Sequence, residues 1–181
     1  MGRVLVRAVW LNGTVGVGKT TVGEVLAEYL AAAGDAVAFI NTDDLGSSWP
    51  RPAEDPFNAA LVTKNLRAVA RNYVAAGALT IVVAGVVQAS AGLRRYTAAL
   101  GIAPRLVRLV VPPEETERRL RGRHGELDAA GLHWHLGRAP ELDDILDKSD
   151  LLMAVVENVG PPLATAMAVL TAIGWPLVAL P

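Results

Sequence analysis

The chain alternates between short apolar runs and longer segments in which apolar residues recur at helical spacing. Five runs are rich in Val, Ile and Leu and have the length of buried strands. They predict strands at residues 4–11, 36–41, 79–87, 105–111 and 151–156. Helical spacing and helix-start signals predict helices at residues 19–33, 58–76, 91–100, 112–123 and 162–173. The polar, mixed segment 124–146 predicts several short helices.

Strands that alternate with helices favour an α/β fold with a parallel sheet covered on both faces. No linker or internal repeat interrupts the pattern, and 181 residues suit one compact domain. We therefore predict a single domain over residues 1–181.

Composition excludes several classes of protein. There is no cysteine, and the net charge is −1 with no long run of one sign, so we expect no thiolate metal site and no nucleic-acid partner. The uncharged segments 73–93 and 159–181 are interrupted by Gly, Pro or polar residues, so we expect no membrane partner and a cytoplasmic protein. Lys19 is one of three lysines beside fourteen arginines.

The candidate chemistry begins directly after the first predicted strand. The segment from Gly13 to Thr20 matches the phosphate-binding pattern G-x-x-x-x-G-K-[ST] in full and opens a predicted helix. Its backbone N–H groups and the helix N-terminus suit the phosphates of ATP, Lys19 suits the β- and γ-phosphates, and Thr20 suits Mg²⁺. The predicted nucleotide-binding residues are Gly13, Thr14, Val15, Gly16, Val17, Gly18, Lys19, Thr20 and Thr21.

Two classes of P-loop protein fit poorly. The Asp43-Asp44-Leu45-Gly46 segment imitates a GTPase switch motif but lies too close to the P-loop, and no Asn-Lys-x-Asp guanine motif exists. A motor ATPase usually carries an acidic residue after its third strand, whereas the third predicted strand here leads into Ala84 and Gly85.

Three motifs together resemble a group of small-molecule kinases. They are the P-loop, a strand that ends in the Asp-containing loop 40–45, and the arginine-rich helix end 118–123. With its size and element order, the chain resembles the P-loop kinases that include adenylylsulfate, shikimate and gluconate kinases and chloramphenicol phosphotransferase. The resemblance implies a three-layer α/β/α fold, a five-stranded parallel sheet of order 2-3-1-4-5, and a helical lid at about residues 122–140.

The same resemblance implies roles for individual residues. Asp43 takes the position of the catalytic aspartate, as a base or as a partner of Mg²⁺ with Thr20. The alternative interpretation of Asp43 is a turn or helix-cap residue. Asp44 is the next candidate for the catalytic position. Arg119 and Arg123 share a helix face and suit the γ-phosphate, unless they only pair with nearby glutamates. The chain departs from adenylylsulfate kinases, because Asn41-Thr42-Asp43 replaces their Asp-Gly-Asp.

The acceptor is expected at the carboxyl edge of the sheet. Candidate acceptor contacts are Asp44, Trp49, Arg51, Gln88 and Arg138, and Asn158 is a candidate for the adenine pocket. The alternative for the Trp49 loop is packing on the core, and Trp134 and the histidines of the lid are interpreted as packing residues.

These residues predict an ATP- and Mg²⁺-dependent phosphotransferase that acts on a hydroxyl of a small molecule, such as a natural product or antibiotic. A nucleoside or nucleotide kinase and a non-catalytic nucleotide-binding regulator are the alternatives. The sequence leaves open the identity of the acceptor and the preference for ATP or GTP. It also leaves open whether the protein is a monomer or a homodimer.

Overall fold

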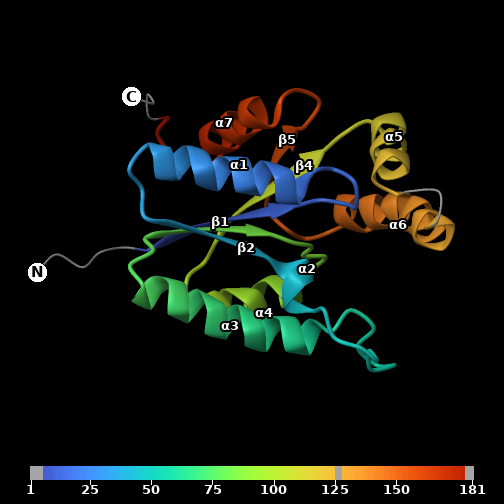
Figure 1. Ribbon diagram of the computed structural model, residues 1–181, viewed down its shortest axis with the longest axis horizontal. Coiled ribbons are helices and arrows are strands. Elements are labelled where there is room, and N and C mark those ends of the chain that lie inside the picture. Colours follow the sequence, from blue (N-terminus) through green and yellow to red (C-terminus); the bar gives the residue numbers. More distant parts are fainter. Residues whose placement is uncertain (1–5, 125–127, 178–181) are drawn as a thin grey trace, which may run out of the picture.

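The computed structural model describes residues 6–124 and 128–177 and contains one parallel sheet (Figure 1). Its strand order β2-β3-β1-β4-β5 confirms the predicted order, and every neighbouring pair is parallel. The strands are β1 (Arg7–Asn12), β2 (Val37–Asn41), β3 (Thr80–Ala84), β4 (Arg105–Val110) and β5 (Ala154–Glu157).

Helices cover both faces of the sheet, so the predicted three-layer arrangement is confirmed. In Figure 1, α1 and α7 lie on one face, α3 and α4 lie on the other, and α5 and α6 lie beyond the ends of the strands. The helices are α1 (Lys19–Ala32), α2 (Thr42–Leu45), α3 (Ala59–Ala75), α4 (Ser90–Leu100), α5 (Pro113–Arg123), α6 (Ala129–Asp147) and α7 (Pro162–Ala172).

The alternation of side chains along β1 explains the layers. Val9 and Leu11 face the core shared with α1 and α7, whereas Ala8 and Trp10 face the core shared with α3 and α4. All four side chains are buried. A central strand that is apolar on both faces is held between two helical layers, which fixes the position of its carboxyl end.

The segment 124–146 differs from the prediction of several short helices. It contains a single long helix, α6, that begins at Ala129 and includes Pro140 in its interior. The Asp128 side chain caps this helix by accepting a hydrogen bond from the Gly131 N–H. The buried residues Ala139, Leu142 and Leu146 follow helical spacing through the proline, so tertiary packing outweighs the proline's local preference.

Other boundaries moved by a few residues. The predicted third strand is shorter, since β3 ends at Ala84, and the predicted fifth strand begins later, at Ala154. Residues 4 and 5 of the predicted first strand, and residues 125–127 of the predicted lid, lie outside the described residues. Within the described part of the chain, no helix combines the length and hydrophobicity needed to cross a bilayer.

The core between the sheet and α3 allows a matched test of burial. Leu66 of α3 is completely buried, whereas Leu152 is 97% exposed. We expect Leu66→Ala to lower the free energy of unfolding by about 2–5 kcal/mol, because it removes buried methyl groups and leaves a cavity. Leu152→Ala, the same chemical change, should alter it by less than about 0.5 kcal/mol in urea denaturation. Equal effects of the two substitutions would contradict this packing.

Candidate active site

The P-loop is fixed at its first residue by a buried asparagine at the end of β1. The Asn12 side-chain oxygen accepts hydrogen bonds from the Gly13 N–H at 2.9 Å and from the Val87 N–H at 3.0 Å. Its amide donates to the Val87 carbonyl at 2.8 Å. The start of the P-loop is thereby attached to the segment that follows β3.

Two glycines of the loop occupy positions that a side chain cannot share. Gly13 has φ +135° and a Cβ there would lie against the carbonyl oxygen of Leu109 in β4. Gly18 has φ +88°, and its Cβ would lie 2.6 Å from Nδ2 of Asn158. Only glycine combines this backbone conformation with such close neighbours.

Asn158 supports the loop with its side chain. Its Nδ2 donates to the Val17 carbonyl at 2.8 Å, and its Oδ1 accepts from the Thr165 hydroxyl at 2.7 Å. Asn158 also lines the cavity beside the P-loop, so its predicted contact with adenine stays a prediction. The sequence did not indicate that this buried amide holds the P-loop against β5 and α7.

Lys19 closes the loop from its other end. Its ammonium donates to the Gly13 carbonyl at 2.9 Å and to the Thr14 carbonyl at 2.8 Å. Burial, with a smaller effect of Arg123, lowers the pKa of Lys19 to about 8 against the opposing effects of Asp43 and Asp143. In this arrangement the ammonium takes part in the loop's own hydrogen bonds, where phosphate oxygens are expected to bind.

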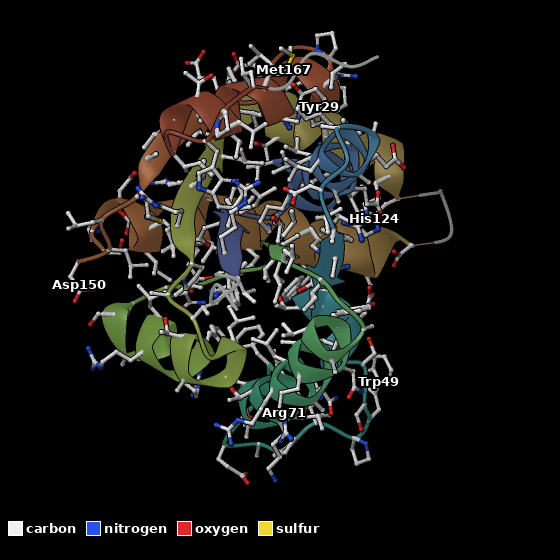
Figure 2. All side chains as sticks on the ribbon, turned by 90° about the vertical axis from the view of Figure 1, so that its left-hand side faces the viewer. Tyr29, Trp49, Arg71, His124, Asp150 and Met167 are labelled. Atoms are coloured by element: carbon white, nitrogen blue, oxygen red, sulfur yellow. The ribbon has the colours of Figure 1, made fainter. Side chains whose placement is uncertain are left out.

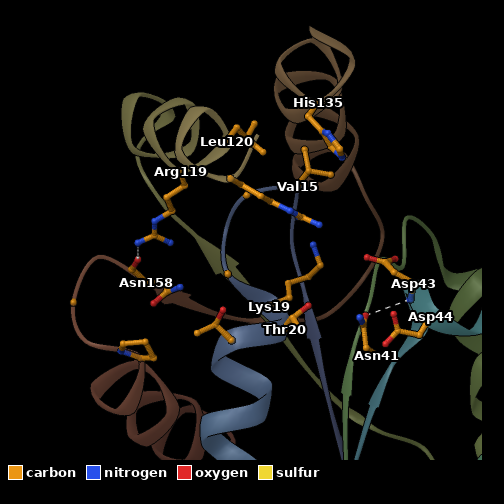
Figure 3. A pocket seen from close by; sticks show the side chains of 16 residues that line it. Val15, Lys19, Thr20, Asn41, Asp43, Asp44, Arg119, Leu120, His135 and Asn158 are labelled. Atoms are coloured by element: carbon orange, nitrogen blue, oxygen red, sulfur yellow. Dashed lines mark hydrogen bonds between the residues drawn. The ribbon is translucent and has the colours of Figure 1, made fainter. Parts of the chain in front are cut away.

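The P-loop borders a cavity of about 630 Å³, here called the P-loop cavity (Figure 3). Ten of the residues predicted for the nucleotide, the metal or catalysis line it: Val15, Gly16, Gly18, Lys19, Thr20, Thr21, Asp43, Arg119, Arg123 and Asn158. Asp44, predicted as an acceptor contact, also lines this cavity. The side chain of Thr14, by contrast, is buried and donates to the Ala139 carbonyl of α6 at 2.8 Å.

The two predicted lid arginines have different surroundings. Arg119 donates to Glu115 and to the Asn158 carbonyl, both at 2.6 Å. These hydrogen bonds hold Arg119 next to Asn158, the residue that supports the P-loop. Arg123 lines the P-loop cavity, and its charge acts on Lys19. Arg118 and Arg121 form exposed ion pairs with glutamates of the same helix. Pairing of this kind was the alternative interpretation of the arginine-rich helix end.

Asp43 lies in the first turn of α2, directly after β2. Its N–H donates to the Asn41 side chain, which caps this short helix. Thr42 is buried beside it, and its hydroxyl would collide with any Cβ at Gly85. This contact leaves no room for a carboxylate side chain at Gly85, directly after β3.

A second cavity of about 640 Å³, here called the side cavity, lies between α2, α4 and α6. Arg51, Gln88 and Arg138 line it, and their contact with an acceptor stays a prediction. Arg138 pairs with Glu141 at 2.8 Å and lies over the Phe57 ring. Trp49 lines neither cavity; it is 72% exposed and projects from the edge of the molecule in Figure 2.

Sequence reasoning missed several residues of the side cavity. Arg95 lines it, whereas its neighbour Arg94 lies outside and donates to Ser90. Trp134 and His135 also line it, although they were interpreted as packing residues. A prediction of one continuous α6 would have placed His135 and Arg138 on the same helix face, three residues apart.

The oxygen atoms of two side chains near the P-loop suit a magnesium ion. The Thr20 hydroxyl and the Asp43 carboxylate line the same cavity, and hard oxygen ligands of this kind are what Mg²⁺ prefers. The described residues contain no group of three or more His, Cys, Asp or Glu side chains placed to hold a metal. Such a site would need phosphate oxygens and water to complete it, as is usual for Mg²⁺.

Comparison with known proteins identifies the family. Residues 9–136, well over half of the chain, match the family model described as an AAA domain (AAA_33). The chain therefore belongs to this family, and its P-loop is that of a nucleotide-binding domain. A search of the curated proteins gave no match.

Solved structures with the same fold include kinases. A gluconokinase from Sinorhizobium meliloti 1021 shares 19% identity at a TM-score of 0.61, covering 96% of this chain and 94% of that one. A shikimate kinase from Bacteroides thetaiotaomicron shares 18% identity at a TM-score of 0.59, covering 93% of this chain and 98% of that one. A tunicamycin resistance protein from Deinococcus radiodurans shares 19% identity at a TM-score of 0.59, covering 96% of this chain and 99% of that one. These likenesses confirm the P-loop kinase fold that the motifs indicated.

The support given by Asn158 can be measured separately from nucleotide chemistry. We expect Asn158→Ala to lower the free energy of unfolding by about 1–3 kcal/mol. It removes the acceptor of the buried Thr165 hydroxyl and leaves the Val17 carbonyl with only the longer hydrogen bond from Arg119, at 3.4 Å. Asn72→Ala, on the exposed face of α3, is the matched control and should have little effect. Thermal and urea unfolding give the comparison, and an Asn158→Ala protein as stable as wild type would contradict the bridging role.

The lowered pKa of Lys19 predicts a pH dependence of nucleotide binding. Its charge is present below pH 8 and is lost in the nucleotide-free protein as pH rises through about 8. We expect the dissociation constant for Mg·ATP to rise about tenfold between pH 7 and 9.5 in titration calorimetry. Lys19→Ala should bind weakly at every pH, and Lys64→Ala, an exposed lysine, should behave like wild type. A flat wild-type profile would contradict the assignment.

Proposed function

We propose that this protein is an ATP- and Mg²⁺-dependent phosphotransferase that acts on a hydroxyl group of a small molecule. One observation carries the proposal: the P-loop cavity and the side cavity meet. Among the described residues, Val15, Lys19, Asp43 and His135 line both of them. A triphosphate on the P-loop would therefore place its γ-phosphate toward a second compartment of molecular size.

The residues of the P-loop cavity suit the charges of phosphoryl transfer. The glycine-rich backbone and the N-terminus of α1 would bind the phosphates, and Lys19 would exchange its loop carbonyls for phosphate oxygens. Thr20 and Asp43 would hold Mg²⁺, which neutralises phosphate charge when bound. Arg123, which lines this cavity, would stabilise charge on the transferred group, and Arg119 would position the loop.

The lining of the side cavity supports a small acceptor with an apolar body. Val62, Val87 and Phe57 supply apolar surface, and Tyr96 and Trp134 add aromatic rings. Arg51, Arg95, Arg138 and Gln88 add polar and positive groups to the lining. A natural product or antibiotic with polar or anionic substituents matches this lining. A nucleoside or nucleotide is the second candidate, because Trp134 and Gln88 suit stacking and hydrogen bonding with a base.

The proposal is tested by following phosphate transfer from Mg·ATP to a panel of hydroxyl compounds, with ³¹P NMR to identify the phosphate ester. We expect transfer by wild type and by the Asp144→Asn control, an exposed carboxylate paired with Lys148. Lys19→Ala and Asp43→Asn should reduce kcat by about 10²-fold or more, because they remove charge and orientation at the junction. Tight Mg·ATP binding without transfer to any class of acceptor would favour a nucleotide-binding regulator instead.

A further inference from the structure

His135 stands at the one place where the proposed reactants would meet. It lines both cavities together with Val15, Lys19 and Asp43. Val15 offers no functional group, and Lys19 and Asp43 already have roles as phosphate and metal partners. Figure 3 shows His135 reaching from α6 toward the space above Lys19 and Asp43. The imidazole is therefore the remaining group at this junction with acid–base chemistry.

The hydrogen bond of the ring fixes its tautomer. Nδ1 lies 2.8 Å from the carbonyl oxygen of Gly131, one turn earlier in α6. A carbonyl oxygen only accepts, so Nδ1 carries the proton and donates it. In the neutral ring Nε2 therefore presents a lone pair. In residues 6–124 and 128–177 no hydrogen-bond partner of Nε2 is found.

The surroundings of the ring favour its neutral form. Burial lowers the pKa of His135; His124 and Arg123, at the C-terminal end of α5, lower it further, while the Gly131 hydrogen bond and Asp128 oppose the shift. The His124 ring lies 4.8 Å from that of His135 and is itself paired with Asp128. Across the junction, the ring faces the cation of Lys19 and the carboxylate of Asp43. A neutral imidazole near pH 7 is available to take up a proton.

Resting on the proposed function, we propose that His135 is the general base of the transfer. The acceptor oxygen forms its bond to the γ-phosphorus while its hydroxyl proton passes to Nε2. The bond from that phosphorus to the β,γ-bridging oxygen breaks, and its electron pair leaves with ADP. The imidazolium then releases the proton to solvent. Asp43 then orients the hydroxyl and holds the metal. Proton removal and metal binding, which Asp43 could otherwise combine, are thus assigned to different residues.

The first test needs no acceptor. Imidazole signals are titrated by NMR in wild type bound to Mg·ADP and to Mg·AMP-PNP, and the His135 signal is assigned by its loss in His135→Gln. If Nε2 faces the γ-phosphate, the additional negative charge should raise the pKa of His135 by about half a unit or more in the AMP-PNP complex. His133, exposed on the same helix, is the internal control and should not respond.

Equal His135 titrations in the two complexes would overturn the inference and leave the phosphotransferase proposal standing. Absence of binding by either nucleotide would overturn both. These outcomes are distinguishable, because calorimetry reports nucleotide binding independently of the imidazole signals.

The second test uses an acceptor from the panel and the pH dependence of kcat. We expect His135→Leu to lower kcat by about 10²-fold or more with little change in KM for ATP, and to lose the acidic limb of the profile. His135→Gln keeps a hydrogen-bond acceptor that does not titrate, so it should lose the limb and recover part of the rate. His133→Gln should match wild type. A wild-type rate and acidic limb in His135→Gln would overturn the role.

Discussion

The structure depends on a loop that has no room for a side chain at two of its positions. Between β1 and α1, Gly13 and Gly18 adopt positive φ angles, and a Cβ on either would meet a neighbouring segment. Asn12 and Asn158 hold the two ends of the loop by buried hydrogen bonds. Held in this way, the loop borders one cavity, and the other candidate functional residues line the same cavity.

The helix α6 connects this loop to the second compartment. Its second half is attached to the sheet, where Arg108 pairs with Asp143 at 3.1 Å and Asp147 at 2.6 Å. Thr14 of the P-loop donates to Ala139 of the same helix. The first half of α6 carries the side chains that face the side cavity, including His135 and Arg138. The P-loop and the proposed acceptor wall are thus parts of one hydrogen-bonded unit.

The sequence predicted the fold and the P-loop because both have local signals. Apolar runs mark strands that are buried on both faces, and the glycine and lysine spacing marks the loop whatever surrounds it. The order of the strands came from family resemblance, since no local pattern contains it. The side cavity was predicted less well: Arg95 faces it while Arg94 does not, and that difference depends on the rotation of α4.

The roles of Asn158 and His135 depend on contacts between distant segments. Asn158 meets Val17 across 141 positions of sequence, and the polar, mixed pattern of residues 124–146 did not indicate the continuous helix that brings His135 to the junction. A crystal structure of the complex with Mg·AMP-PNP tests this arrangement most directly. We predict that the γ-phosphate lies between Lys19, Asp43 and His135, where the two cavities meet. A nucleotide bound away from the P-loop, or a γ-phosphate directed away from the side cavity, would contradict it.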